Sequence, residues 1–133
     1  MVRVTGPVVV RETDVSWETR SDPERHARSP IRWRLLVSAD RTASAGLTVG
    51  VLEIPPGASM LRHHHAPQEV YYVLEGEGRS ELGDLVTPVR PGTTLFIPTN
   101  ASHKTVNTGP GPLRFLWVFP TDTFAEIRYH YEE

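Results

Sequence analysis

Short runs in which apolar and polar residues alternate follow one another along the chain from residue 31 onward. In the first run, Trp33, Leu35 and Val37 fall on one face, and Arg32 and Arg34 fall on the other. Such a period of two residues is typical of β-strands, because successive side chains in a strand point to opposite faces. The pattern predicts strands at residues 31–37, 47–54, 59–65, 69–75, 95–97, 102–107, 113–119 and 127–131.

Residues that favour tight turns separate the predicted strands. They occur at 76–78, 83–84 and 91–92, and each of these turns contains glycine. No amphipathic stretch is long enough for a major helix, and residues 122–126 are expected to form at most one helical turn. Many short antiparallel strands need a closed barrel or two packed sheets to protect their edges. The chain is therefore predicted to be all-β, a jelly roll or small barrel that encloses a cavity.

The N-terminal part of the chain has a weaker pattern. Residues 1–30 are predicted to form a strand and an arm, and residues 31–133 the barrel, within one domain overall. Residues 17–30 are polar and fit a surface loop, a short helix begun by Ser21 or Asp22, or an arm that orders against a partner. Because strand edges need cover, residues 2–11 are expected to form a strand donated to the second subunit of a homodimer.

Composition narrows the function classes. The chain has 133 residues, a formal net charge of −2 and no cysteine. Without cysteine there are no disulfides, thiol nucleophiles or iron–sulfur clusters. The charges are nearly balanced and scattered, which argues against binding to nucleic acid or to a membrane surface. Neither a signal-peptide pattern nor a membrane-spanning apolar run is found, so a cytoplasmic location is the expectation.

Three histidines and one glutamate form a candidate metal site. By the strand period, His63 and His65 share one face. If the strand beginning at Glu69 pairs back antiparallel, Glu69 can point into the same interior, and His103 is a fourth candidate. Imidazole and carboxylate suit one divalent transition metal ion, which can be Fe, Mn, Ni, Zn, Co or Cu. Single histidines in strands are more often surface or hydrogen-bonded residues, and this interpretation is kept for His26, His64 and His130.

The same residues stand at the spacing of two known motifs, and the chain resembles the cupin superfamily. The first cupin motif is matched at every fixed position, by Gly57, His63, His65, Glu69 and Gly76. The second is matched by Gly92, Pro98, His103 and Asn107. In this second motif Asn100 replaces a glycine, a mild departure because asparagine tolerates left-handed backbone. The resemblance implies a cupin jelly-roll β-barrel and a metal held by His63, His65, Glu69 and His103.

A narrower resemblance covers most of the chain from residue 31 to residue 129. The runs 31–36, 46–50 and 119–122, followed by Phe124, Glu126 and Tyr129, are similar to those of short single-domain cupins that cleave dimethylsulfoniopropionate. In those lyases a tyrosine two residues after the glutamate ligand is implicated as the base, and Tyr71 stands there. The resemblance also implies a second tyrosine near the C-terminus, matched by Tyr129.

Three functions are compatible with such a site. The first is a metal-dependent lyase, in which a local charge near +1 favours a small anionic substrate and Tyr71 removes its α-proton. To act as a base near pH ~8, Tyr71 needs a pKa lowered from ~10, which a nearby cation can supply. The second is an Fe(II)-dependent dioxygenase that uses the same ligands. The third is a non-catalytic cupin that binds a small molecule.

Other residues have plainer interpretations. Tyr71 can be an ordinary interior aromatic residue, and Tyr129 can simply cap the barrel. Arg32 and Arg34 are solvated charges if their face is the outer one, and Lys104 points away from His103 by strand parity. The strand apolar residues are expected to form the core: Leu52, Ile54, Leu95, Ile97, Phe115, Trp117 and Phe119.

Overall fold

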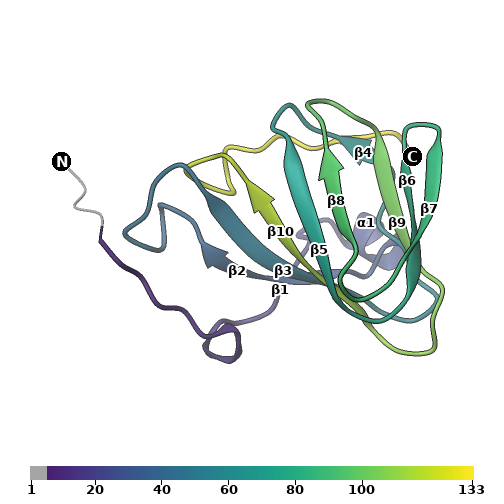
Figure 1. Cartoon of the computed structure of the whole chain (residues 1–133), viewed down its shortest axis with the longest axis horizontal. Helices are drawn as coiled ribbons and strands as arrows, with labels where there is room; N and C mark the ends of the chain where they lie inside the picture. Colours follow the sequence, from purple (N-terminus) through teal and green to yellow (C-terminus); the bar gives the residue numbers. More distant parts are fainter. Residues whose placement is uncertain (1–5) are drawn as a thin grey trace.

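The computed structural model describes residues 6–133 and contains two antiparallel sheets that curve around a common interior (Figure 1). The six-stranded sheet has the order β1 (Glu18–Thr19), β2 (Arg32–Val37), β3 (Thr48–Ile54), β10 (Leu113–Phe119), β5 (Glu69–Glu75) and β8 (Thr94–Ile97). The five-stranded sheet has the order β11 (His130–Tyr131), β4 (His63–His64), β9 (His103–Asn107), β6 (Gly78–Leu82) and β7 (Leu85–Val89). The all-β jelly-roll prediction is confirmed.

The alternation predicted from the sequence places the core between the sheets. Along β10, Leu113, Phe115, Trp117 and Phe119 are buried while the residues between them are half-buried. Gly50 on the neighbouring β3 makes room for one of these rings, because a Cβ there would lie 2.1 Å from the Trp117 side chain. Every residue assigned to the core from the sequence is buried.

Three strand predictions were wrong in detail. Residues 59–65 form a strand only at His63–His64, and Ser59 makes an isolated bridge to Val106. The C-terminal strand is confined to His130–Tyr131, and residues 122–126 form bends and turns with no helix. The hairpin of β6 and β7 was not predicted, because its inward position Ser80 is polar and Pro88 interrupts the strand pattern. Proline is tolerated there because β7 is an edge strand.

The two strands that carry the candidate ligands do not pair with each other, so the antiparallel pairing considered for them does not occur. β4 pairs with β9 and β11, whereas β5 pairs with β10 and β8 in the other sheet. The turn after His65 therefore crosses from one sheet to the other instead of closing a hairpin. As a result, the candidate ligands approach the interior from both sheets.

The N-terminal arm packs along the barrel. Of the three possibilities for residues 17–30, the structure shows a short helix, α1 (Pro23–Arg28), begun by Asp22, whose side chain accepts hydrogen bonds from the backbone of Glu24 and Arg25. Before it come a 3₁₀ turn at Glu12–Asp14 and strand β1. Residues 6–11 are not in a strand, contrary to expectation, and residues 2–5 lie outside the described part.

Among residues 6–133, none of the helices has the length and apolar character needed to cross a membrane.

The arm is held by arginines on the outer face of β2. Trp17 lies under the guanidinium groups of Arg32 and Arg34, at 4.0 and 4.2 Å from its ring centre. Glu12 accepts hydrogen bonds from Arg34 at 2.7 Å and from Arg114. Arg32 and Arg34 therefore serve the outer surface and do not line the interior.

Candidate metal centre

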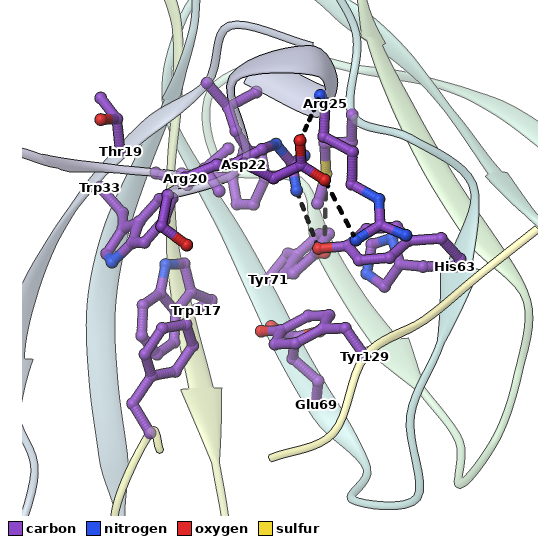
Figure 2. Close-up of a pocket in the computed structure, with 17 residues that line it drawn as sticks. Thr19, Arg20, Asp22, Arg25, Trp33, His63, Glu69, Tyr71, Trp117 and Tyr129 are labelled. Atoms are coloured by element: carbon purple, nitrogen blue, oxygen red, sulfur yellow. Dashed lines mark hydrogen bonds and ion pairs between the residues drawn. The ribbon is translucent and has the colours of Figure 1, made fainter. Parts of the chain in front are cut away.

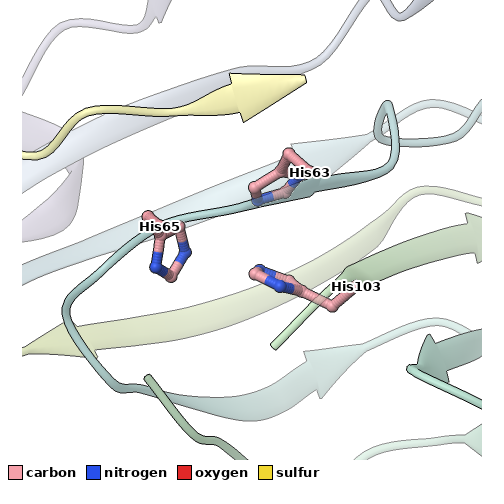
Figure 3. Close-up of side chains that lie close together, drawn as sticks. All are labelled: His63, His65 and His103. Carbon is pink, nitrogen blue, oxygen red and sulfur yellow. The ribbon is translucent and has the colours of Figure 1, made fainter. Parts of the chain in front are cut away.

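Three histidine side chains meet inside the barrel, as Figure 3 shows. His63 lies on β4 directly opposite His103 on β9, and His65 follows β4 at the start of the crossing turn. One ring nitrogen of each lies within 4.8 Å of the other two. All three side chains are almost completely buried. Buried polar atoms need partners, so this cluster requires an explanation.

The hydrogen bonds of the three rings fix which nitrogen faces the interior. The Nδ1 atoms of His63, His65 and His103 lie 2.7–2.8 Å from the carbonyl oxygens of Leu61, Pro67 and Ala101. A carbonyl oxygen only accepts, so each Nδ1 carries the proton and donates it. Each Nε2 then holds a free lone pair. The Nε2 atoms of His63 and His103 are buried without a hydrogen-bond partner among the described residues.

Glu69, the first residue of β5, brings a carboxylate to the same point from the opposite sheet. Its Oε1 lies 3.1 Å from Nε2 of His65 and 3.5 Å from Nε2 of His103. When Nδ1 holds the proton, these contacts bring acceptor against acceptor, and they are favourable only with a cation or a proton between them. Ligand atoms about 2.0–2.2 Å from one ion lie about 3 Å apart. The four side chains therefore fit a divalent transition metal ion.

The protonation state of His63 agrees with this assignment. Burial lowers the pKa of His63 well below its usual value, and the neighbouring His103 lowers it further. The neutral imidazole is the form that binds a metal. His63 is thus prepared to act as a ligand at neutral pH.

The crossing turn that carries His65 is held by the loop between β8 and β9. The backbone N–H of Asn100 donates to the His65 carbonyl oxygen at 2.9 Å. Asn100 has a positive φ of 59°, the left-handed conformation expected from its place in the second motif. Asparagine adopts this conformation more readily than most residues, which explains why it can replace glycine.

A cavity of about 350 Å³ opens beside this cluster and reaches His63 and Glu69 (Figure 2). Its walls are mainly aromatic: Trp33, Tyr71, Phe115, Trp117, Phe124, Tyr129 and Tyr131. The side covered by the N-terminal arm is polar and includes Thr19, Arg20, Ser21, Asp22 and Arg25. The size falls at the lower end of ligand-binding pockets, which span roughly 300–1,000 Å³.

Both predicted catalytic tyrosines line this cavity. Tyr71 points inward from β5, with its hydroxyl directed at the sulfur of Met60 and its ring 6.1 Å from that of His103. Burial raises the pKa of Tyr71 well above its usual value, and the Glu69 carboxylate adds to this. This direction is opposite to the one a base requires. The lower pKa that Tyr71 needs as a base therefore depends on a positive charge that the protein side chains do not provide.

Tyr129 covers the histidine rings. Its ring lies 5.3 Å from those of His63 and His65, centre to centre. The pKa of Tyr129 is also raised well above its usual value, first by burial and then by Glu69. Tyr129 is therefore a neutral phenol placed between the cluster and the cavity.

The remaining histidines and Lys104 lie away from the cluster. His64 stacks on His130 and contacts Glu132 at 3.1 Å, while Lys104 pairs with Glu133 at 2.8 Å. His26 lies on α1, is half-buried and does not line the cavity. None of these side chains contributes to the candidate metal centre.

Sequence reasoning missed the residues at the cavity mouth, above all Arg20, Arg25 and Tyr131. They come from the arm and from the C-terminal strand, and no motif or periodicity marked them. Only their position in the fold, with Arg20 donating to the Tyr131 hydroxyl across 111 residues, connects them to the site.

The Cupin domain family model matches residues 50–119 of the chain. The chain is 36% identical to a dimethylsulfoniopropionate lyase, DddW, of Ruegeria pomeroyi over 101 residues, which are 76% of this chain and 66% of that protein, just under two thirds. It is 30% identical to an oxalate-binding protein of Thermotoga maritima over 112 residues, 84% of this chain and 92% of that protein. The solved structure of the polyketide cyclase RemF from Streptomyces resistomycificus is also similar, with a TM-score of 0.76 and 27% identity over 96% of this chain and 88% of that one.

Proposed function

The chain belongs to the cupin family, and on that premise we propose that it is a metal-dependent lyase that acts by β-elimination on a small carboxylate substrate. The observation that supports this most strongly is the buried cluster of three inward-facing Nε2 atoms and one carboxylate beside a cavity. The similarity to a dimethylsulfoniopropionate lyase supports the reaction type.

His63, His65, Glu69 and His103 are the residues that would hold the ion. A divalent cation in this cluster would supply positive charge that attracts a substrate carboxylate, acidifies its α-proton and favours the deprotonated form of a nearby phenol. The protein contributes three neutral imidazoles and one carboxylate, which together with such an ion leave a net charge of about +1.

Tyr71 is the proposed base, because its hydroxyl lines the cavity next to Glu69 without belonging to the ligand cluster. In the reaction the substrate Cα–H bond breaks and the proton moves to the Tyr71 oxygen. The electron pair left on Cα forms the Cα=Cβ bond, and the β-substituent leaves with its bonding pair. Tyr129, which lies over two of the histidines, contacts the substrate from the other side and excludes water.

A second candidate is non-catalytic binding. The similarity to an oxalate-binding protein along 92% of its length favours this reading, and the ligand cluster would be the same. An Fe(II)-dependent dioxygenase would also use these four ligands. The three functions differ in whether a product forms and in whether oxygen is needed.

The test is a screen of metal-loaded protein against β-substituted small carboxylates, dimethylsulfoniopropionate among them, with unsaturated products followed by NMR. Elimination at equal rates in air and under argon supports the lyase. A product that forms only in air identifies a dioxygenase, and tight binding without any product identifies a binder. Either of these last outcomes overturns the proposal.

We also propose a cytoplasmic homodimer. The outer face of β5 and β8 exposes Tyr72, Leu74 and Phe96. β8 is an edge strand, so its outer backbone N–H and C=O groups are open to pairing with a strand of a second copy. Light scattering is expected to give twice the chain mass, and Phe96→Glu to give the monomer mass. A monomeric parent protein would contradict the homodimer. Cell fractionation tests the location and should recover the protein in the cytoplasmic fraction.

A further inference from the structure

One positively charged side chain in the cavity has no counter-ion. Figure 2 shows Arg20 with Asp22 and Arg25 on the side of the cavity formed by the arm, away from Glu69. Among residues 6–133, five arginines make no ion pair within 4.0 Å, namely Arg11, Arg20, Arg28, Arg90 and Arg128. The other four are exposed, whereas Arg20 is half-buried and lines the cavity.

The hydrogen bonds of Arg20 hold it in place without neutralising it. Its three nitrogens donate to the Ser29 carbonyl oxygen at 3.3 Å, the Ser29 hydroxyl at 3.1 Å and the Tyr131 hydroxyl at 2.8 Å. All three acceptors are uncharged. A guanidinium has five N–H donors, so two of them are left for another partner. Arg20 is thus a rigidly held cation that can still bind an anion.

The other charges of the cavity are already balanced. Asp22 accepts two backbone hydrogen bonds at the start of α1 and lies 3.8 Å from Arg25. Glu69 belongs to the ligand cluster, where a bound divalent ion would outweigh its charge. The remaining uncompensated charge is that of Arg20, and the aromatic walls between offer no carboxylate to match it.

Arg20 is close enough to the cluster for one small molecule to reach both. A single tyrosine separates them, because the Tyr131 hydroxyl accepts from Arg20 at 2.8 Å and the Tyr131 ring centre lies 6.1 Å from that of His63.

We propose that Arg20 determines the substrate class by binding a second anionic group, so that the preferred substrates are short dicarboxylates. This inference rests on the proposed function, which places the first carboxylate at the ligand cluster. Arginine suits the second one because its planar fork forms paired, charge-assisted hydrogen bonds to carboxylates. A substrate with a sulfonium or ammonium group at that end would instead meet the like charge of Arg20.

The experiment compares two acids of equal length, succinate and butyrate, by calorimetric titration into the zinc-loaded protein near pH 7.5. Succinate is expected to bind more tightly by about tenfold or more, as one added charge-assisted hydrogen-bonded pair implies. Arg20→Gln should remove this preference and should strengthen binding of dimethylsulfoniopropionate. Arg28→Gln is the matched control, since Arg28 is an exposed arginine without an ion pair on α1, and it should keep the preference.

Arg20→Lys separates recognition of charge from support of the arm. Lysine keeps the positive charge but cannot reproduce the three hydrogen bonds, so it should retain part of the preference even if Arg20→Gln fails to fold. The inference is overturned if succinate and butyrate bind alike to the parent protein, if Arg20→Gln keeps the preference, or if the lysine variant loses it completely. If neither acid binds the parent protein, the proposed carboxylate function falls together with this inference.

Discussion

The two ends of the cavity are built in different ways. At the inner end, each histidine of the cluster is oriented by a carbonyl oxygen only two residues away along the chain. At the mouth, Arg20 and Tyr131 meet from opposite ends of the chain, and the arm that carries Arg20 is attached to the barrel through ion pairs and stacking. We infer that the inner end sets the chemistry and the mouth sets which molecule enters.

Mutations at the two ends of the cavity should therefore have different effects. Changes at the inner end should abolish metal binding or turnover. Changes at the mouth and in its supports should leave the metal in place and alter selectivity or stability by smaller amounts.

The largest effect is expected from removal of a cluster histidine. His65→Ala deletes one of the proposed Nε2 ligands and leaves the Glu69 carboxylate without its nearest partner, so metal affinity should fall by a factor on the order of 100 or more. Elemental analysis after dialysis against trace metal measures this. His64→Ala is the matched control, because the neighbouring side chain faces outward and should leave the metal content unchanged. Equal metal loss in both variants would contradict the assignment of the ligands.

The second largest effect is expected at Tyr71, the proposed base, which lies at the inner end of the cavity but is not a proposed metal ligand. Tyr71→Phe removes only the cavity-facing hydroxyl, so the protein should keep its metal while turnover falls by roughly 10²–10⁴-fold, the usual contribution of a general base. Tyr72→Phe provides the control, since Tyr72 points to the outer surface. Unchanged turnover in Tyr71→Phe would remove this residue from the mechanism.

A smaller effect tests how the arm is attached. Burial would raise the pKa of Glu12, but hydrogen bonds from Arg34 and Arg114 outweigh it and hold the pKa below its usual value. The carboxylate therefore stabilises the fold at neutral pH, and this contribution is lost as the pH falls from about 4.5 through the lowered pKa. Glu12→Gln should cost about 1 kcal/mol in the free energy of unfolding at pH 7 and much less in acid.

Denaturant titrations at several pH values measure this contribution, with Asp14→Asn in the same segment as the control. Metal content should be the same in both variants. A cost for Glu12→Gln that does not change between pH 7 and pH 3 would show that the ion pairs do not fasten the arm.

The smallest effect concerns the turn behind His65. Since Asn100 has φ of 59°, Asn100→Gly should change the free energy of unfolding by less than about 0.5 kcal/mol, while Asn100→Ala should cost about 1 kcal/mol. Chemical denaturation of both variants measures the pair. Equal stability of the two would mean that the left-handed backbone does not matter to this turn.

The same contrast explains what could be predicted from the sequence. The candidate ligand set could be proposed before the fold was known, because His63, His65 and Glu69 are closely spaced and, together with His103, match the two cupin motifs. The partner strand of β4 could not be predicted, because the sequence of the turn after His65 is compatible both with a hairpin and with a crossing between the two sheets. The hairpin of β6 and β7 was missed because a buried serine and a proline weaken its pattern.

The mouth was beyond prediction for a different reason. Residues 17–30 show little periodicity, and the partners of Arg20 are Ser29, which is nine residues away, and Tyr131, which is 111 residues away. No local rule connects an arginine in a polar segment with a tyrosine near the other terminus. Such contacts become visible only when the arm is placed against the barrel.

Anomalous diffraction from crystals of the metal-loaded protein tests the central claim most directly. The account predicts one strong peak inside the barrel, about 2.0–2.3 Å from the Nε2 atoms of His63, His65 and His103 and from a carboxylate oxygen of Glu69. No peak at this position, or an ion held by Nδ1 atoms or by surface residues such as His64 and His130, would contradict it.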